Sequence, residues 1–420
     1  MEAYYYSKMD KTKQAAYHAM LQGLLALEDS IPMPRLEAED LYQVFFLLRL
    51  DHPEIFWATG YKYRYYPESA NLVFLPEYLF EKSKIREHQK AMKARVEKLA
   101  RAAQNLSEWE KEKYVHDFIC ENVHYDKLKK PYSHEIIGPL GQGVGVCEGI
   151  AKSVKVLCDA LGIWCVIALC GNCPEKGIKY RHTWNIVKIG GQYYHLDATF
   201  DNTLGAGAQI RYDYFNLCDK SIFRDHQPLI APAPECTDAA HFYYREKKLS
   251  FTKMEDVYKR ALQTAKRGKT FTFHWRGGYL TREVFEELLE QISGVGRERG
   301  KSARVSVNWQ QAVLRFDYVE AGSAPEARVA VSYTHLDGTK QCGYYECKKC
   351  GNRFLSLQTM TRIPCPDCAS EVDYEIGPDE TLADVTDTAV LLQKIEGEEE
   401  VAKMDALLSL AITGGDFNWI

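Results

Sequence analysis

The sequence predicts an α+β fold centred on a buried helix followed by an antiparallel hairpin. Apolar residues recur at spacings of three and four from Ile150 to Leu161, which is the period of a helix with one apolar face. Two apolar-rich runs then flank Gly190-Gly191, a pair typical of a two-residue hairpin turn. With 420 residues, the chain is long enough for two or three domains with separate cores.

Residues 1–105 predict a mostly helical N-terminal extension. Its expected elements are helices at 11–27 and 81–104, a helix that ends near Asp51, and aromatic strands at 61–66 and 72–80. The motif Asp51-His52-Pro53-Glu54 contains acid-base residues, but we interpret Pro53 as a helix end, because a proline disfavours helical backbone in the residue before it. We expect the extension to pack on the core and to shape a cleft there.

The core is predicted at 106–230 and begins with a capped helix. Ser107 and Glu110 have the S-x-x-E spacing of a capping box. Farther on, the glycine-broken turn GQGVGV places Cys147 in the first turn of the apolar helix. Backbone N–H groups without intrahelical partners point out of such a terminus and stabilise an anion there. We therefore expect a lowered pKa for Cys147 and a thiolate that can act as a nucleophile.

The hairpin predicts a histidine and an aspartate within reach of each other. With Gly190-Gly191 as the turn, the paired residues are Ile189 with Gln192, Trp184 with Asp197, and His182 with Thr199. Residues two apart share a face, and this face carries His182, Trp184, His195, Asp197 and Thr199. His182 and Asp197 are then diagonal neighbours about 7–8 Å apart. A carboxylate so placed can hold one imidazole nitrogen while the other faces a thiol.

These segments resemble a known family. The runs GVCEGIAKSVKVLCDALGI and HTWNIVKIGGQYYHLDATFDN are similar to the core of the transglutaminase-like superfamily, and EKYVHDFICENVHYD is similar to the helix that precedes the cysteine in bacterial members. The resemblance implies a papain-type fold over about 106–230. It also implies that Cys147 is the nucleophile, His182 the base and acid, and Asp197 the orienting group. His195 is a second histidine on the same face, and we favour His182 because it starts its strand, where a cleft would open.

The expected function is thiol-dependent acyl transfer or hydrolysis at an amide bond of a protein or peptide, through a thioester. Protease, deamidase and transglutaminase chemistry remain open, because the choice between water and an amine depends on the cleft. The backbone N–H of Cys147 is expected to hold the oxyanion, with Gln142 as a possible second donor and Trp184 as a cleft residue. The alternative is a non-catalytic module of the same fold that binds other proteins. A zinc-dependent catalyst would need an open metal position.

The C-terminal half predicts further modules. A small α/β domain is expected at 245–322, a zinc ribbon at 342–372 and an acidic helical tail at 373–420. The ribbon contains two CxxC pairs with fourteen residues between them, a spacing that matches a closed structural zinc site of Cys347, Cys350, Cys365 and Cys368. Cys170 and Cys173 form another CxxC pair, which can be a redox pair or half of a metal site, but no matching second pair lies nearby. No organic cofactor is expected.

The composition limits the classes of partner and the compartment that we expect for this protein. The net charge of −5 provides no general attraction to nucleic acid or to anionic membranes, and the ribbon carries only a modest basic set, Lys348, Lys349, Arg353 and Arg362. No run of about 18 apolar residues predicts a membrane span, and the N-terminus has no apolar signal region. Thirteen cysteines with CxxC pairs fit a reducing compartment. We therefore expect a cytoplasmic protein with a possible protein partner at the ribbon.

Overall fold

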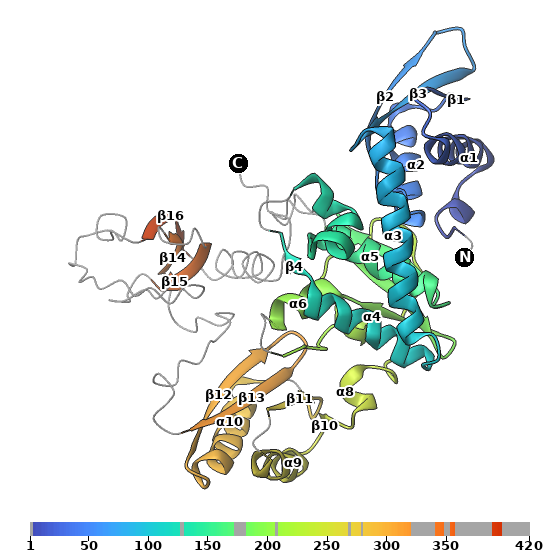
Figure 1. Ribbon diagram of the computed structural model, residues 1–420. Coiled ribbons are helices and arrows are strands. Elements are labelled where there is room, and N and C mark those ends of the chain that lie inside the picture. Colours follow the sequence, from blue (N-terminus) through green and yellow to red (C-terminus); the bar gives the residue numbers. More distant parts are fainter. Residues whose placement is uncertain are drawn as a thin grey trace. The chain divides into compact units, whose positions relative to one another are not determined.

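The computed structural model describes residues 3–126, 130–171, 182–205, 209–267, 270–278 and 280–320, and the backbone of three strands at 341–347, 353–357 and 389–396. The described chain forms two units, the first up to Leu249 and the second from Ser250 (Figure 1). The fold is α+β, as the sequence predicts. None of the described helices has both the length and the apolar run needed to cross a bilayer.

The N-terminal region has the predicted elements. Helices α1 (Lys11–Ala26), α2 (Ala38–Asp51) and α3 (Lys82–Ala103) accompany strands β1 (Ile31–Pro34), β2 (Ala58–Tyr65) and β3 (Asn71–Tyr78). The strands form an antiparallel sheet in the order β1-β3-β2. Helix α2 ends before Pro53, and the buried carboxylate of Asp51 accepts hydrogen bonds from the backbone of Tyr5 and Tyr6 and from the Tyr17 hydroxyl. These contacts give Asp51 the structural role that was predicted.

The core of the first unit packs helices against an antiparallel sheet. Its helices are α4 (Glu108–Asn122), α5 (Cys147–Ala160), α6 (Ala198–Gly205), α7 (Asp219–Ile222) and α8 (Tyr243–Glu246), with short helical turns η2 (Pro131–His134) and η3 (Ile137–Gln142) and the strand pair β4 (His124–Tyr125) and β5 (Val144–Gly145). The sheet order is β6 (Cys165–Cys170), β7 (His182–Ile189), β8 (Gln192–Leu196), β9 (Phe215–Leu217). The predicted capping box of Ser107 and Glu110 is present, and α5 is anchored to β7 by a 2.9 Å hydrogen bond from Asn185 Nδ2 to the Ala151 carbonyl.

The hairpin register is confirmed next to the turn but not at the far end. Residues pair as predicted from Ile189–Gln192 to Asn185–Leu196, and both glycines of the turn have positive φ. The predicted pairs of Trp184 with Asp197 and His182 with Thr199 do not form, because β8 ends at Leu196. Asp197 Oδ1 instead accepts the backbone N–H groups of Thr199 and Phe200, at 2.9 and 3.0 Å, and so starts helix α6.

The second unit contains the predicted alternation of helices and strands. Helices α9 (Met254–Lys266) and α10 (Arg282–Arg297) accompany a sheet in the order β10 (Ser250–Phe251), β11 (Phe271–Trp275), β13 (Val313–Glu320), β12 (Lys301–Asn308). Farther on, β14 (Gln341–Cys347) pairs with β15 (Arg353–Leu357) and with β16 (Ala389–Glu396). The predicted helical tail is therefore wrong at 389–396, where pairing with β14 satisfies the backbone of a segment rich in Val, Leu and Ile.

One buried acid on α4 affects how the core responds to pH. The Glu112 side chain is fully buried; Asn216 Nδ2 donates to its Oε2 at 2.9 Å, and its Oε1 has no hydrogen-bond partner in the described chain. Burial raises the pKa of Glu112 to about 8, against smaller lowering effects of Asn216 and His116. The folded state therefore holds a proton that the unfolded chain releases.

Replacing Glu112 by Gln tests this proton. Wild-type stability should fall as pH rises from the ordinary pKa of 4.5 to about 8, because only the folded state keeps Glu112 protonated there. In Glu112→Gln this loss is removed, so the stability of the variant relative to wild type should rise by up to about 1.4 kcal/mol per pH unit across that window. Urea unfolding at several pH values measures the difference, with exposed Glu121→Gln on the same helix as control. Equal pH slopes in Glu112→Gln and wild type would contradict the assignment.

Candidate active site

Cys147 is the first residue of α5 and is 2 % exposed. The preceding residue, Val146, is the N-cap and has no side-chain oxygen to accept the N–H groups of the first turn. The same turn contains Gly149, where a Cβ atom would clash with the Ser133 carbonyl oxygen, so only glycine lets η2 pack against the helix start. The helix thus begins with a thiol and with amide donors that no side chain caps.

His182, the first residue of β7, lies between Asp197 and Cys147. Its Nε2 is 2.6 Å from Asp197 Oδ2, and its Nδ1 has no hydrogen-bond partner within bonding geometry in the described residues. Burial alone would lower the pKa of His182, but the charge and hydrogen bond of Asp197, followed by interaction with the Cys147 thiol, raise it to about 9. Since Asp197 occupies Nε2, Nδ1 is the nitrogen available to the thiol.

Asp197 is a fully buried carboxylate with four donors. Oδ2 accepts from Nε2 of His182 at 2.6 Å and from Nε2 of His226 at 2.9 Å, whereas Oδ1 accepts two amides of α6. Burial acts to raise the pKa of Asp197, but the charges and hydrogen bonds of the two histidines hold it well below its ordinary value. The carboxylate is therefore ionised and acts as an acceptor toward both rings.

His226 is the residue that sequence reasoning missed. Its buried ring lies 5.3 Å from that of His182, and its Nδ1 is 2.7 Å from Asp225 Oδ1. Burial would lower the pKa of His226, but hydrogen bonds to Asp197 and Asp225 raise it to about 9. The residue follows Asp197 by 29 positions in an irregular segment, so no periodicity links the two. The acidic residue directly before it, Asp225, was the one sequence signal available.

His195 is held in a different hydrogen-bond network. Trp184 Nε1 donates to its Nδ1 at 2.9 Å, so the ring proton is on Nε2, which donates to Asp219 Oδ1 at 2.8 Å. Burial lowers the pKa of His195 despite Asp219. Both nitrogens are thus engaged away from Cys147, and this geometry favours His182 as the imidazole that serves the thiol. Trp184 is buried and does not line the cleft, contrary to the prediction.

Two clusters in the described part of the chain have residue types that bind metals. They are His182, Asp197 and His226, and His195, Asp219 and Cys236, each with its potential ligand atoms within 4.8 Å. In both, the imidazole Nε2 lies at hydrogen-bond distance from a carboxylate oxygen, which can only accept, so each cluster also forms a hydrogen-bond network.

The remaining predicted site residues are only partly described. Gln142 is exposed at the end of η3, and no described hydrogen bond joins it to Cys147. Cys170 is buried at the end of β6, where burial raises the pKa of its thiol to about 11; Cys173 lies outside the described residues. Cys347 ends β14, and Cys350, Cys365 and Cys368 also lie outside the described residues. The seven cysteines whose side chains the structure describes all have free thiols.

A buried charge cluster joins α2 to the start of α5. Arg49 pairs with Glu135 and, at 3.6 Å, with Glu148; Lys152 binds Glu135 at 2.9 Å and Glu148 at 2.7 Å. Burial acts to raise the pKa of Glu148, but Lys152, His134 and Arg49 hold it well below its ordinary value. The N-terminal region is thus tied by ion pairs to the helix that carries Cys147.

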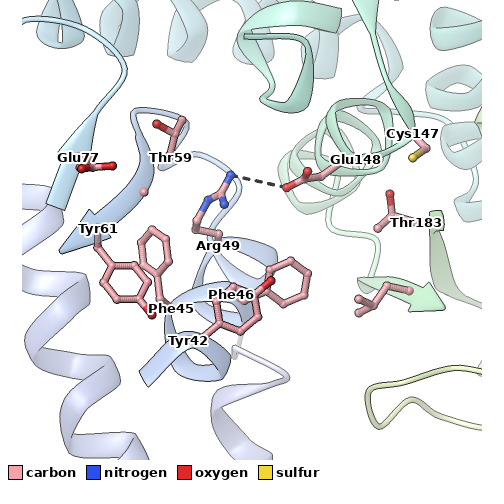
Figure 2. A pocket seen from close by; sticks show the side chains of 12 residues that line it. Tyr42, Phe45, Phe46, Arg49, Thr59, Tyr61, Glu77, Cys147, Glu148 and Thr183 are labelled. Atoms are coloured by element: carbon pink, nitrogen blue, oxygen red, sulfur yellow. Dashed lines mark ion pairs between the residues drawn. The ribbon is translucent and has the colours of Figure 1, made fainter. Parts of the chain in front are cut away.

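A pocket of about 450 Å³ opens at Cys147. Figure 2 shows aromatic side chains of α2 and β2 on one side, Cys147 and Thr183 on the other, and the Arg49–Glu148 pair between them. The prediction that the N-terminal extension shapes a cleft beside the cysteine is therefore confirmed. A thiol, an imidazole and a carboxylate next to an aromatic pocket form the kind of site that thiol-based acyl transfer requires.

Comparisons with known proteins give a family match and structural likenesses. Residues 93–198, which include Cys147, His182 and Asp197, match the transglutaminase-like superfamily and form a domain of that type. A crystal structure of a TGase matches at 11% identity over 34% of this chain and 44% of that chain, with a TM-score of 0.22. A Cytophaga hutchinsonii protein proposed to be a cysteine protease matches at 18% identity over 36% of this chain and 69% of that chain, with a TM-score of 0.23.

The chain thus spans less than half the length of the TGase chain that it matches. No curated protein matches the sequence. The superfamily consists mainly of cysteine enzymes, so the domain match suggests thiol-dependent amide chemistry.

The shared carboxylate leads to a prediction for His226→Gln. A histidine whose folded pKa is raised from 6.5 to about 9 adds stability that is present below pH 6.5 and lost as pH rises through about 9. The free energy of unfolding of the variant should therefore be lower than that of wild type by about 2 kcal/mol at pH 6, which is the strength of a charge-assisted hydrogen bond. Above pH 9 the difference should be much smaller. Urea unfolding at both pH values tests this, with exposed His124→Gln as control. A loss independent of pH would show that His226 is not protonated in the folded state.

Proposed function

We propose that this protein is a thiol-dependent enzyme that attacks amide carbonyls of proteins or peptides. The observation that supports it best is the position of the His182 ring, bound through Nε2 to Asp197 and interacting with the Cys147 thiol. The superfamily match over 93–198 supports the same chemistry. In this proposal Cys147 is the nucleophile, His182 the proton carrier and Asp197 the group that orients the ring.

The proposed reaction has two halves. In the reactive form the thiol proton rests on His182 Nδ1, in keeping with the raised pKa of this ring, and the sulfur of Cys147 bonds as a thiolate to the carbonyl carbon, which gives a tetrahedral oxyanion. The uncapped amides at the start of α5 are placed to stabilise that charge, and Gln142 remains the proposed second donor. His182 then gives its proton to the leaving amine, and a thioester remains on Cys147.

The acceptor decides the product. Water releases a carboxylic acid, as a protease or deamidase would, whereas a primary amine forms a new amide, as a transglutaminase would. In either case His182 removes a proton from the acceptor and returns it to the sulfur. Because Asp197 is ionised and its two oxygens are fully used by donors, it holds the ring without itself moving a proton.

A peptide pool analysed by mass spectrometry, with and without an added primary amine, tests the proposal and separates the three chemistries. Wild-type protein should give cleaved, deamidated or amine-linked peptides. Cys147→Ala should abolish them, and His182→Ala should lower the rate about 100-fold or more, since it removes the proton carrier. Cys218→Ala replaces a free thiol elsewhere in the core and should retain activity. Product formation that survives Cys147→Ala, or an unchanged pool with wild type, would favour the non-catalytic binding module instead.

We also propose that Cys347, Cys350, Cys365 and Cys368 hold a structural zinc ion. The support is their spacing and the β14–β15 pair, in which Cys347 is the last residue of β14 and Arg353 the first residue of β15. Purified protein should contain about one zinc per chain by elemental analysis, and Cys365→Ser together with Cys368→Ser should remove it. Full zinc content in the double variant would contradict this assignment. Cys342→Ser is the control.

A further inference from the structure

The pocket beside Cys147 is built mainly by the N-terminal region. Eight of its twelve lining residues come from α2, β2 and β3, and all of these precede residue 93, where the superfamily match begins. The residues that line this side are Tyr42, Phe45, Phe46, Arg49, Thr59, Gly60, Tyr61 and Glu77. Recognition at this pocket is therefore a property of segments outside the matched domain.

The wall opposite Cys147 is aromatic. The rings of Tyr42 and Phe46 stack at 5.9 Å, and the ring of Phe45 meets that of Tyr61 edge to face at 5.1 Å. Tyr42 is 45% exposed, so part of its ring is open to a ligand. Planar rings of this kind bind apolar side chains and other rings with little loss of conformational entropy.

The charged groups of the pocket cancel. Arg49 and Lys152 are balanced by Glu135 and Glu148 in one buried cluster, and Glu77 on the rim pairs with Lys62 at 2.9 Å. No net charge is left to select an acidic or a basic side chain. The occupant is therefore expected to be apolar where it meets the aromatic wall.

Arg49 places a charged group on the pocket wall that needs no further anion. Its Nη2 pairs with Glu135 and, at 3.6 Å, with Glu148. Its Nε has no hydrogen-bond partner in the described residues, but this nitrogen is buried and out of reach of a ligand. Because two carboxylates already neutralise the guanidinium, a neutral ligand suits this wall better than an anion.

The sheet edge favours an extended ligand. In the order β1-β3-β2, strand β2 has a strand partner on one side only within the described chain, and its residues Thr59, Gly60 and Tyr61 line the pocket. Extended peptides bind such edges through backbone hydrogen bonds and place alternate side chains into adjoining pockets. A peptide lying along β2 would supply both an apolar side chain and a row of carbonyls.

We propose that this pocket binds an extended polypeptide segment of the substrate, with an aromatic or large aliphatic side chain against Tyr42, Phe46 and Tyr61 and its backbone along the edge of β2. The assignment rests on the proposed function, in which Cys147 attacks the same chain. It names the substrate class as an unfolded or looped protein segment with a bulky apolar residue near the reacting amide.

Binding can be measured apart from chemistry in Cys147→Ala protein. Fluorescein-labelled nonapeptides from the reactive members of the pool, or from the unreacted pool if none react, carry Phe, Leu, Asp or Lys at each position in turn. By fluorescence anisotropy, Phe or Leu at one position should bind about tenfold or more tighter than Asp or Lys at that position.

Two pocket variants separate recognition from folding. Phe46→Ala should remove the preference for Phe, and Tyr42→Glu should reverse it in favour of Lys, a swap that a merely destabilised protein would not produce. Tyr66→Ala, a 79% exposed tyrosine beyond β2, is the control and should bind as Cys147→Ala alone does. Peptide binding without any apolar preference, or a Tyr42→Glu variant with unchanged selectivity, overturns this inference while leaving the chemistry intact. Selective binding without turnover by wild type would instead overturn the proposed function alone.

Discussion

The structure of the site depends on one buried carboxylate. Asp197 accepts hydrogen bonds from two imidazoles through one oxygen and from two amides of α6 through the other. A buried carboxylate is stable only when such donors compensate for its lost hydration. The same group therefore ends strand β8, starts helix α6 and fixes the ring of His182. The ring cannot turn away from Cys147 without leaving part of this charge uncompensated.

The start of α5 has the opposite property, because no side chain of the described residues caps its amide donors. Val146 offers no oxygen to the first turn, although a polar N-cap would stabilise a helix by about 1 kcal/mol. The close packing of η2 at Gly149 and the ion pairs of Lys152 hold this turn in place without a cap. A helix start whose amide N–H groups are not capped by a side chain can still bind an anion that forms only during a reaction.

Local sequence signals predicted much of the fold around the candidate site. The glycine pair set the register of β7 and β8, the spacing of Ser107 and Glu110 set the start of α4, and apolar periodicity set α5. The end of β8 was mispredicted because strand alternation was extended through Asp197, whose preference for a helix start prevailed. His226 could not be found because it reaches Asp197 through a tertiary contact that leaves no periodic trace.

The residues that line the pocket were not predicted from the sequence, because most of them lie outside the segment that carries the predicted catalytic residues. The residues with acid-base chemistry lie within 93–198, whereas most of the pocket wall precedes this segment. Substitutions in the aromatic wall can thus change what binds without moving the thiol. Arg49 is different, because its ion pairs reach Glu148, the residue after Cys147, and through Glu135 they reach Lys152. A ligand that engages Arg49 therefore acts on the same charges that hold the first turn of α5, so binding and chemistry are coupled at that side chain.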